Sequence, residues 1–153
     1  APDTIVAVEV KTASPVMDKV RDAITATGSL DRVILFSFHP RQIAASRQLM
    51  PTVPTLLLID PDITGIPYPP SVAATARDIG ASAVGLNHES VNQSVVDSAH
   101  RMELPVFVYT VDARADVQRM LALGVDGIIS NQPRATATHI AVARSSLQAG
   151  DPE

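Results

Sequence analysis

The sequence predicts an α/β protein in which the strands of a parallel sheet alternate with helices. Six apolar, β-rich segments alternate with six segments of helical period along the 153 residues. Hydrophobic residues make up 46% of the chain and aromatic residues only 3%, which is typical of parallel strands covered on both faces. Gly28, Gly80 and Gly124 each follow a predicted helix, where a left-handed C-terminal cap is favoured.

The first unit joins a strand at residues 4–11 to a helix at 14–27. Ser14 is a suitable N-cap for that helix, and Pro15 suits its first turn. The other five units have strands at 32–38, 55–60, 83–86, 105–111 and 127–130, followed by helices at 40–49, 71–79, 90–102, 113–123 and 134–147. Strands that alternate with helices in this way indicate a parallel sheet with right-handed crossovers.

One long irregular segment, 60–70, follows the third strand and carries four prolines. It would lie at the C-terminal face of a barrel, where such folds build their sites, or it is simply a loop stiffened by proline. Residues 148–153 are polar and are expected to form a frayed tail. We therefore expect one domain at 1–147 and a tail at 148–153.

Composition excludes several classes of function. The net charge is −4, from 12 basic and 16 acidic residues, and no basic run is present, so nucleic-acid binding is not expected. The chain has no cysteine, which excludes disulfides and thiolate metal sites. It has no apolar run of about 18 residues, so no membrane span is expected.

The first strand carries an acidic and a basic residue on one face. Side chains alternate along a strand, so Glu9 and Lys11 share a face and lie about 7 Å apart between α-carbons. Positions 6, 8 and 10 are all valine, and that opposite face suits packing against helices. In a barrel the two charges point inward at the C-terminal rim. They serve one ligand there, through a hard cation and an anion, or they pair only with each other.

The other strand ends carry weaker candidates. His39 is a possible ligand or a solvated loop residue, and residues 87–89 (Asn-His-Glu) either contact substrate or cap the next helix. Tyr109 is either a pocket wall or one of the few core aromatics, whereas Asp112 is expected to be a helix N-cap. Two further histidines are expected on helix surfaces, namely His100 and His139.

Five segments, in order, resemble the C-terminal portion of the glycerophosphodiester phosphodiesterase family. VEVK at 8–11 resembles the strand I-E-I-K, and FSFHP at 36–40 resembles S-F-D-P. GASAV at 80–84 resembles the segment after the helix of the fifth unit. VFVYTVD at 106–112 resembles V-W-T-V-N, and GVDGIISNQP at 124–133 resembles G-V-D-G-I-I-T-D-x-P. The fold implied is a TIM (β/α)8 barrel, of which this chain would hold six units, with the first two absent.

The resemblance implies hydrolysis of glycerophosphodiesters to glycerol 3-phosphate and an alcohol. The family uses a divalent cation, calcium or magnesium, and a pair of histidines as acid and base. By resemblance Glu9 is a metal ligand, Lys11 meets the substrate phosphate, and Tyr109 stands where the family has a pocket tryptophan. The expected partner is a small glycerophosphodiester.

The chain departs from the family in its catalytic groups. The family's H-R-G, E-N-T, E-x-D and H-D motifs all precede the I-E-I-K strand, whereas eight residues precede Glu9 here. No residue is therefore assigned as catalytic, since none of the four histidines matches a catalytic position. The closing Thr-Asp of the family is Ser130-Asn131. We expect the chain alone to be inactive or nearly so.

Six strands also leave the barrel open, with an unpaired edge at each end of the sheet. The preferred explanation is a longer protein that supplies the first two units. A second chain that closes the gap and an open, degenerate sheet are the alternatives. The rival functions are a non-enzymatic phosphate-binding or interaction module on a degenerate barrel, and an unrelated βα-barrel enzyme that shares only the closing strand.

Overall fold

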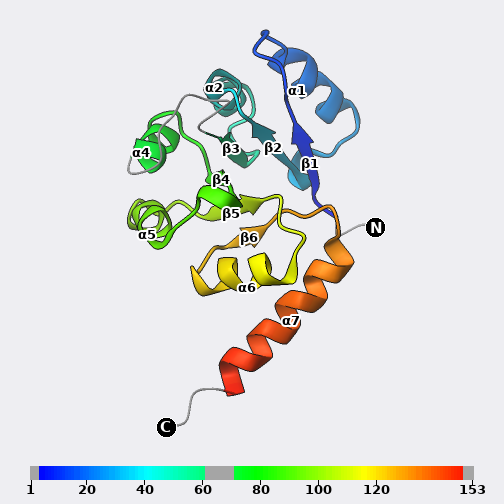
Figure 1. Ribbon diagram of the computed structural model, residues 1–153. Coiled ribbons are helices and arrows are strands. Elements are labelled where there is room, and N and C mark those ends of the chain that lie inside the picture. The colour runs from blue at the N-terminus through cyan, green and yellow to red at the C-terminus, as the bar shows by residue number, and fades with distance from the viewer. Residues whose placement is uncertain (1–3, 61–70, 150–153) are drawn as a thin grey trace.

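The computed structural model describes residues 4–60 and 71–149 (Figure 1). Six strands form a single sheet in chain order, and each pairs in parallel with the next. The strands are β1 (Val6–Glu9), β2 (Val33–Ser37), β3 (Thr55–Ile59), β4 (Ala83–Asn87), β5 (Val106–Tyr109) and β6 (Gly127–Ile128). The sheet curls into a half-barrel, which confirms the predicted fold class.

A helix separates each described pair of strands. The α-helices are α1 (Met17–Ala26), α2 (Pro40–Leu49), α4 (Ser71–Asp78), α5 (Gln93–Arg101), α6 (Arg114–Ala122) and α7 (Pro133–Ala149), and the short 3₁₀ turns are η1 (Leu30–Arg32) and η2 (His88–Ser90). The prediction was wrong at the start of α1, which begins at residue 17 after the N-cap Val16 instead of at 14. The Ser14 carbonyl instead accepts a hydrogen bond from Gln42, which holds that residue in the loop.

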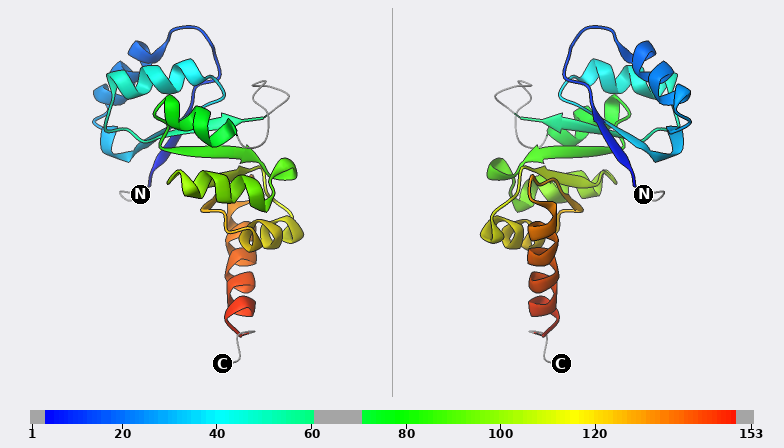
Figure 2. Two further views of the ribbon diagram at one scale, coloured as in Figure 1. Left: turned by 90° about the vertical axis from the view of Figure 1, so that its left-hand side faces the viewer. Right: turned by 90° about the vertical axis from the view of Figure 1, so that its right-hand side faces the viewer.

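The face of the sheet that carries the helices forms most of the core. Along β2, Val33, Leu35 and Ser37 are buried because they point toward the helices. One cluster joins β1 and β2 to α1 and α2, and a larger one joins β3, β4 and β5 to the later helices. The helices α2, α4 and α5 lie along one side of the sheet, whereas α7 extends away from it (Figure 2).

The concave face carries a third, smaller cluster, centred on Leu56, Leu58 and Ala83. Six partly buried hydrophobic side chains surround these residues, namely Ile34, Phe36, Phe38, Phe107, Tyr109 and Ile129. Glycine makes room for this layer, since a β-carbon at Gly85 would lie 2.7 Å from Leu58 Cδ2 and one at Gly127 would collide with the Phe107 ring.

The two edge strands, β1 and β6, are not paired with each other in the described part of the chain. Ile5 is 67% exposed and Val6 is 49% exposed. Of the three valines expected to pack against helices, only Val8 and Val10 do so. No helix within residues 4–60 and 71–149 is long and apolar enough to span a membrane.

Candidate functional site

The loop after β1 is fastened by buried polar side chains from the next unit. The Ser37 hydroxyl donates to the Val10 carbonyl at 2.7 Å. The Gln42 side-chain amide donates to the carbonyls of Thr12 and Ser14 at 2.8 and 2.6 Å. Ser37 and Gln42 are buried, so these bonds satisfy groups that would otherwise be costly to desolvate. The first strand end is therefore held rigidly against the second.

His39, the N-cap residue of α2, joins the same loop. A ring nitrogen, Nε2, lies 3.1 Å from the Lys11 carbonyl, and the His39 backbone N–H donates to Ser37 Oγ at 3.0 Å. The residue is half-buried. One ring nitrogen of His39 thus helps to hold the loop after β1, so the residue is more than a solvated loop histidine.

Glu9 and Lys11 form an ion pair at the C-terminal end of β1. Lys11 Nζ lies 3.6 Å from Glu9 Oε2, and the two side chains are 79% and 33% exposed. Exposure keeps the energy of such a pair small, so both groups remain available to a ligand. The pairing expected for an exposed strand end is present, and it does not exclude ligand binding.

A hard cation would need more than this pair. The described residues contain no group of three or more His, Asp or Glu side chains placed to hold a metal ion. Calcium takes six to eight oxygen ligands and magnesium six. The Glu9 carboxylate has the right donor chemistry for either ion, and it fits one position of such a site.

Tyr109 lies across the concave face at the end of β5. Its hydroxyl donates to the Ile59 carbonyl at 3.0 Å, and its ring meets Phe38 edge-to-face with centroids 5.8 Å apart. Phe38 shares a face with Phe36, the register partner of Glu9. The phenylalanines of β2 and the loop after it therefore connect Tyr109 with the first strand end.

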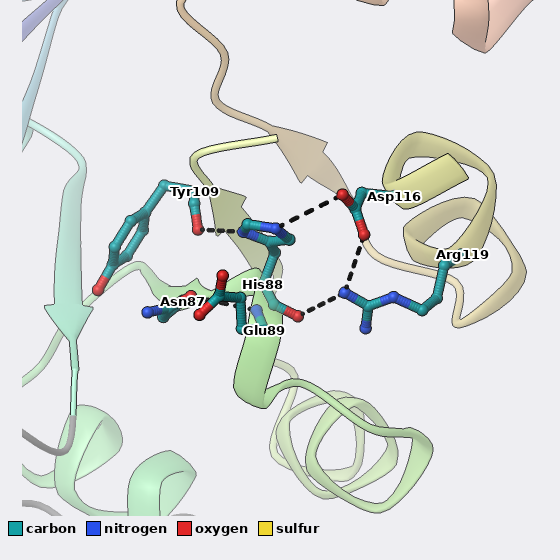
Figure 3. Close-up of polar contacts among 6 residues, drawn as sticks. All are labelled: Asn87, His88, Glu89, Tyr109, Asp116 and Arg119. Atoms are coloured by element: carbon teal, nitrogen blue, oxygen red, sulfur yellow. Dashed lines mark hydrogen bonds and ion pairs between the residues drawn. The ribbon is translucent and has the colours of Figure 1, made fainter. Parts of the chain in front are cut away.

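His88 lies at the centre of a polar cluster between β4 and α6 (Figure 3). Its Nδ1 is 3.2 Å from the Tyr109 carbonyl, and its Nε2 is 3.8 Å from Asp116 Oδ2. Arg119 Nη2 donates to the His88 carbonyl at 3.0 Å and to Asp116 Oδ1 at 3.4 Å. Sequence reasoning missed Asp116 and Arg119. The signal for them was an acidic and a basic residue three apart near the start of α6, which predicts only a surface pair.

The neighbouring Asn87 is a capping residue. Its side-chain oxygen accepts from the Glu89 backbone N–H at 3.1 Å, and its amide donates to Asp60 at 3.4 Å. It caps the short turn η2, whereas α5 is capped by Asn92, which accepts from the Val95 N–H at 3.2 Å. Residues 87–89 were expected either to contact substrate or to cap the next helix. Asn87 has a capping role, and the element that it caps is η2.

Asp112 is not a helix N-cap, contrary to the prediction. The N-cap of α6 is Ala113, without a side-chain cap bond. The Asp112 carboxylate turns to the end of β6 instead and accepts from Ser130 Oγ at 2.6 Å and from the Asn131 backbone N–H at 2.9 Å. These bonds, that from Ser130 first, hold the pKa of Asp112 below its ordinary value.

Relative to the family motifs that they resemble, the acid and the amide at positions 112 and 131 have changed places. The motif V-W-T-V-N ends in Asn where this chain has Asp112, and G-V-D-G-I-I-T-D has Asp where it has Asn131. The two side chains contact each other, with Asn131 Nδ2 3.4 Å from Asp112 Oδ2. The carboxylate missing from the end of β6 therefore reappears one strand away.

The two remaining histidines lie in helices, as expected, but neither is merely solvated. His100 Nε2 lies 2.8 Å from Asp126 Oδ2, an atom that also accepts from the Val106 backbone N–H. His139 is half-buried, and its Nδ1 is buried without a hydrogen-bond partner in the described structure. His139 is thus only partly at the surface, since one of its ring nitrogens is buried.

Comparisons with known proteins agree on one family. Residues 2–135 match the family model described as the glycerophosphoryl diester phosphodiesterase family. The chain is 29% identical over 118 residues to a glycerophosphodiester phosphodiesterase of Bacillus altitudinis, covering 76% of this chain and 46% of that protein. It is 30% identical over 104 residues to one of Bacillus subtilis, covering 67% of this chain and 34% of that protein.

Solved structures show the same fold. A glycerophosphodiester phosphodiesterase from Parabacteroides distasonis matches with a TM-score of 0.72 at 19% identity, covering 94% of this chain and 59% of that one. An Oleispira antarctica phosphodiesterase, solved with its product sn-glycerol-3-phosphate, matches with a TM-score of 0.73 at 11% identity, covering 90% and 55%. The chain spans less than half the length of the curated relatives it matches. It belongs to the glycerophosphoryl diester phosphodiesterase family.

Proposed function

We propose that this chain forms the substrate-holding, C-terminal part of a metal-dependent phosphodiesterase that hydrolyses glycerophosphodiesters to glycerol 3-phosphate and an alcohol. Residues 1–147 would form the barrel units, as expected from the sequence, but α7 continues to Ala149, so a tail would begin at residue 150 and not at 148. The observation that carries the proposal is the pairing of Glu9 with Lys11 at 3.6 Å, at a strand end of a chain that belongs to this family. A carboxylate and an ammonium so close together suit a phosphate held with a cation.

Glu9 would contribute one oxygen ligand to a calcium or magnesium ion. Its side chain is one-third exposed, and Lys11 is its only ion-pair partner among the described residues. Other groups, phosphate oxygens and water among them, would complete the coordination shell. A divalent cation bound there would polarise the phosphate.

Lys11 would bind a phosphate oxygen, and Tyr109 would wall the side of the site on the concave face. The Lys11 ammonium is largely exposed, and its backbone is fixed by His39. A charge-assisted hydrogen bond from a fixed lysine is stronger than one between neutral groups. The Tyr109 ring offers a flat apolar surface to the glycerol or alcohol part of the diester.

We propose that the described residues do not supply the groups that transfer protons. The histidine that contacts the Lys11 segment, His39, already uses its Nε2 there, and His88 lies in its own network at the ends of β4 and β5. Losing a general acid or base costs roughly 10²–10⁴-fold in rate. We therefore propose that this chain by itself binds product and turns over substrate poorly or not at all.

The test is calorimetry with sn-glycerol 3-phosphate, with and without calcium or magnesium. Lys11→Met should weaken binding about ten-fold or more, the loss expected for a charge-assisted bond. Glu9→Gln should remove the dependence on the cation. The matched control is Lys19→Met, which removes an exposed lysine on α1. Equal affinity in Lys11→Met and Lys19→Met would overturn the assigned role of Lys11.

A non-enzymatic phosphate-binding or interaction module is the second candidate. The observation that favours it is the Asp112–Asn131 exchange, since these groups satisfy each other at the end of β6. Hydrolysis of glycerophosphocholine distinguishes the two. Calcium- or magnesium-dependent turnover by this chain that disappears in Glu9→Gln would show that it does not lack catalytic machinery. Binding of glycerol 3-phosphate without turnover fits both candidates, and turnover after the chain is joined to the rest of a barrel supports the enzyme.

A further inference from the structure

We propose that His88 is a positioning residue that fixes Tyr109 over the concave face, and that this contact sets how tightly the rim holds a glycerol phosphate group. The second half of this inference rests on the proposed function. The contact itself is independent of it. His88 lies on the short turn η2 just after β4, and Tyr109 ends the neighbouring strand β5, with Asn87 as its register partner.

Tyr109 is held at both ends. Its carbonyl lies 3.2 Å from His88 Nδ1, and its hydroxyl reaches the Ile59 carbonyl on β3 at 3.0 Å. In Figure 3 the ring points away from His88 while the carbonyl points toward it. The imidazole therefore restrains the backbone from which the ring extends, while the ring itself lies on the concave side with Phe38.

The chemistry of the contact defines the proton on His88. A backbone carbonyl only accepts hydrogen bonds, so Nδ1 must carry the hydrogen in this contact. The other ring nitrogen then faces the Asp116 carboxylate at 3.8 Å. The hydrogen bond at Nδ1 therefore sets the orientation of the imidazole, and the Asp116 carboxylate lies beside its other nitrogen.

The backbone of His88 is fixed as well. Arg119 donates to the His88 carbonyl and, through the same nitrogen, to Asp116. The His88 side chain is only 16% exposed, so little solvent competes for its contacts. Contacts from α6 thus fix the position of η2, and η2 fixes the end of β5 through His88. A ring placed by such a chain of contacts depends on every member of it.

Two conservative substitutions separate the two contacts of His88. The amide nitrogen of asparagine occupies nearly the position of Nδ1, and that of glutamine nearly the position of Nε2. His88→Asn therefore retains a donor for the Tyr109 carbonyl and loses the contact with Asp116. His88→Gln does the reverse, and His88→Leu loses both.

The position of Tyr109 is read by fluorine NMR on 3-fluorotyrosine-labelled protein. The chain has two tyrosines, so Tyr68→Phe leaves Tyr109 as the only signal. In that background His88→Asn should retain the parent resonance, whereas His88→Gln and His88→Leu should shift or broaden it. A Tyr109 resonance unchanged in His88→Gln would overturn the proposal. Should His88→Leu not fold, the Asn and Gln variants carry the comparison alone.

The second measurement is the affinity for sn-glycerol 3-phosphate in the same variants. His88→Gln should weaken binding about five-fold, the equivalent of one hydrogen bond, and His88→Asn should stay near the parent. If the parent does not bind glycerol phosphate at all, the proposed function fails while the fluorine signal still tests the positioning. If His88→Gln moves the resonance but leaves the affinity unchanged, the link between His88 and binding is wrong.

Discussion

At the end of β5, the Asp112 carboxylate accepts hydrogen bonds from the Ser130 hydroxyl and the Asn131 backbone, and these donors lower its pKa. A carboxyl with a lower pKa in the folded state adds stability above its unfolded pKa and loses it as the pH falls through the folded value. The ordinary value is 3.8, so the loss belongs to the range below about pH 4.

Asp112→Asn should therefore flatten the acid limb of the stability curve. Urea unfolding from pH 7 to pH 3 gives the free energy of unfolding of the parent and the variant. The difference between them should shrink as the pH falls below about 4, because protonation removes the same interaction from the parent. Asp31→Asn, an exposed carboxylate in η1, is the control. A difference that stays constant across this range would contradict the assignment.

The exchange of Asp112 and Asn131 predicts a rescue. Asn131→Asp alone sets a second carboxylate beside Asp112, and Asp112→Asn alone removes the acceptor charge of the pair. Both single variants should be destabilised. The double variant restores one carboxylate and one amide in contact, so its loss of stability should be smaller than the sum of the two single losses. Urea unfolding of the four proteins at pH 7 measures these losses. Additive effects would show that the contact carries no coupling.

Sequence reasoning at the residue scale succeeded where partners are close in the chain. Glu9 and Lys11 are two apart on one strand, so strand geometry alone predicts their proximity. The prediction for Asp112 was wrong because its hydrogen-bond donors follow the next strand, 18 and 19 residues later in the chain. Its nearest backbone amides belong to a helix start, which made capping the more probable role from sequence alone.

The start of α5 depends on one side chain. Asn92 accepts from the Val95 backbone N–H, while the preceding residues form the separate turn η2. Asn92→Ala should lower the free energy of unfolding by about 1 kcal/mol, the usual value of an N-cap. Asn92→Asp retains the acceptor and should leave stability nearly unchanged. Thermal and urea unfolding measure both. An equal loss in the two variants would mean that Asn92 acts through a contact other than the cap.

Most elements could be predicted from the sequence, because each unit repeats the same signals. The period changes from two to 3.6 between strand and helix, and a glycine with positive φ follows α1, α4 and α6. Helix starts were less predictable. Serine favours the N-cap position, so Ser14 and Ser90 both suit a helix start. The Gln42 side chain holds Ser14 in a loop, however, and Ser90 is the last residue of η2. Tertiary contacts decided both positions.

At the scale of the whole molecule, chain order sets the neighbours in the sheet but leaves its edges open. The strands lie in chain order from β1 to β6, as in the barrel that the motifs imply. The sequence also predicted the two unpaired edges, since six strands are too few for the barrel that the motifs imply. The curl of the sheet is not encoded in the local patterns, because it depends on how the side chains of the concave layer pack together.

The β1 edge predicts association at high concentration. Exposed Ile5 and Val6 lie beside backbone groups that have no further strand to pair with in the described structure. Such an edge recruits other strands, and a lysine on it opposes this. Sedimentation from low to about 100 µM should show a rising mass for the parent and less for Val6→Lys.

Val142→Lys is the matched control for this test, because it makes the same change at a half-exposed valine of α7, the helix that extends away from the sheet. It should associate like the parent. If both lysine variants suppress association equally, net charge is the cause and the edge is not. If the parent stays monomeric over the whole range, the prediction is wrong, because an exposed β1 edge would then not be enough to recruit a second chain.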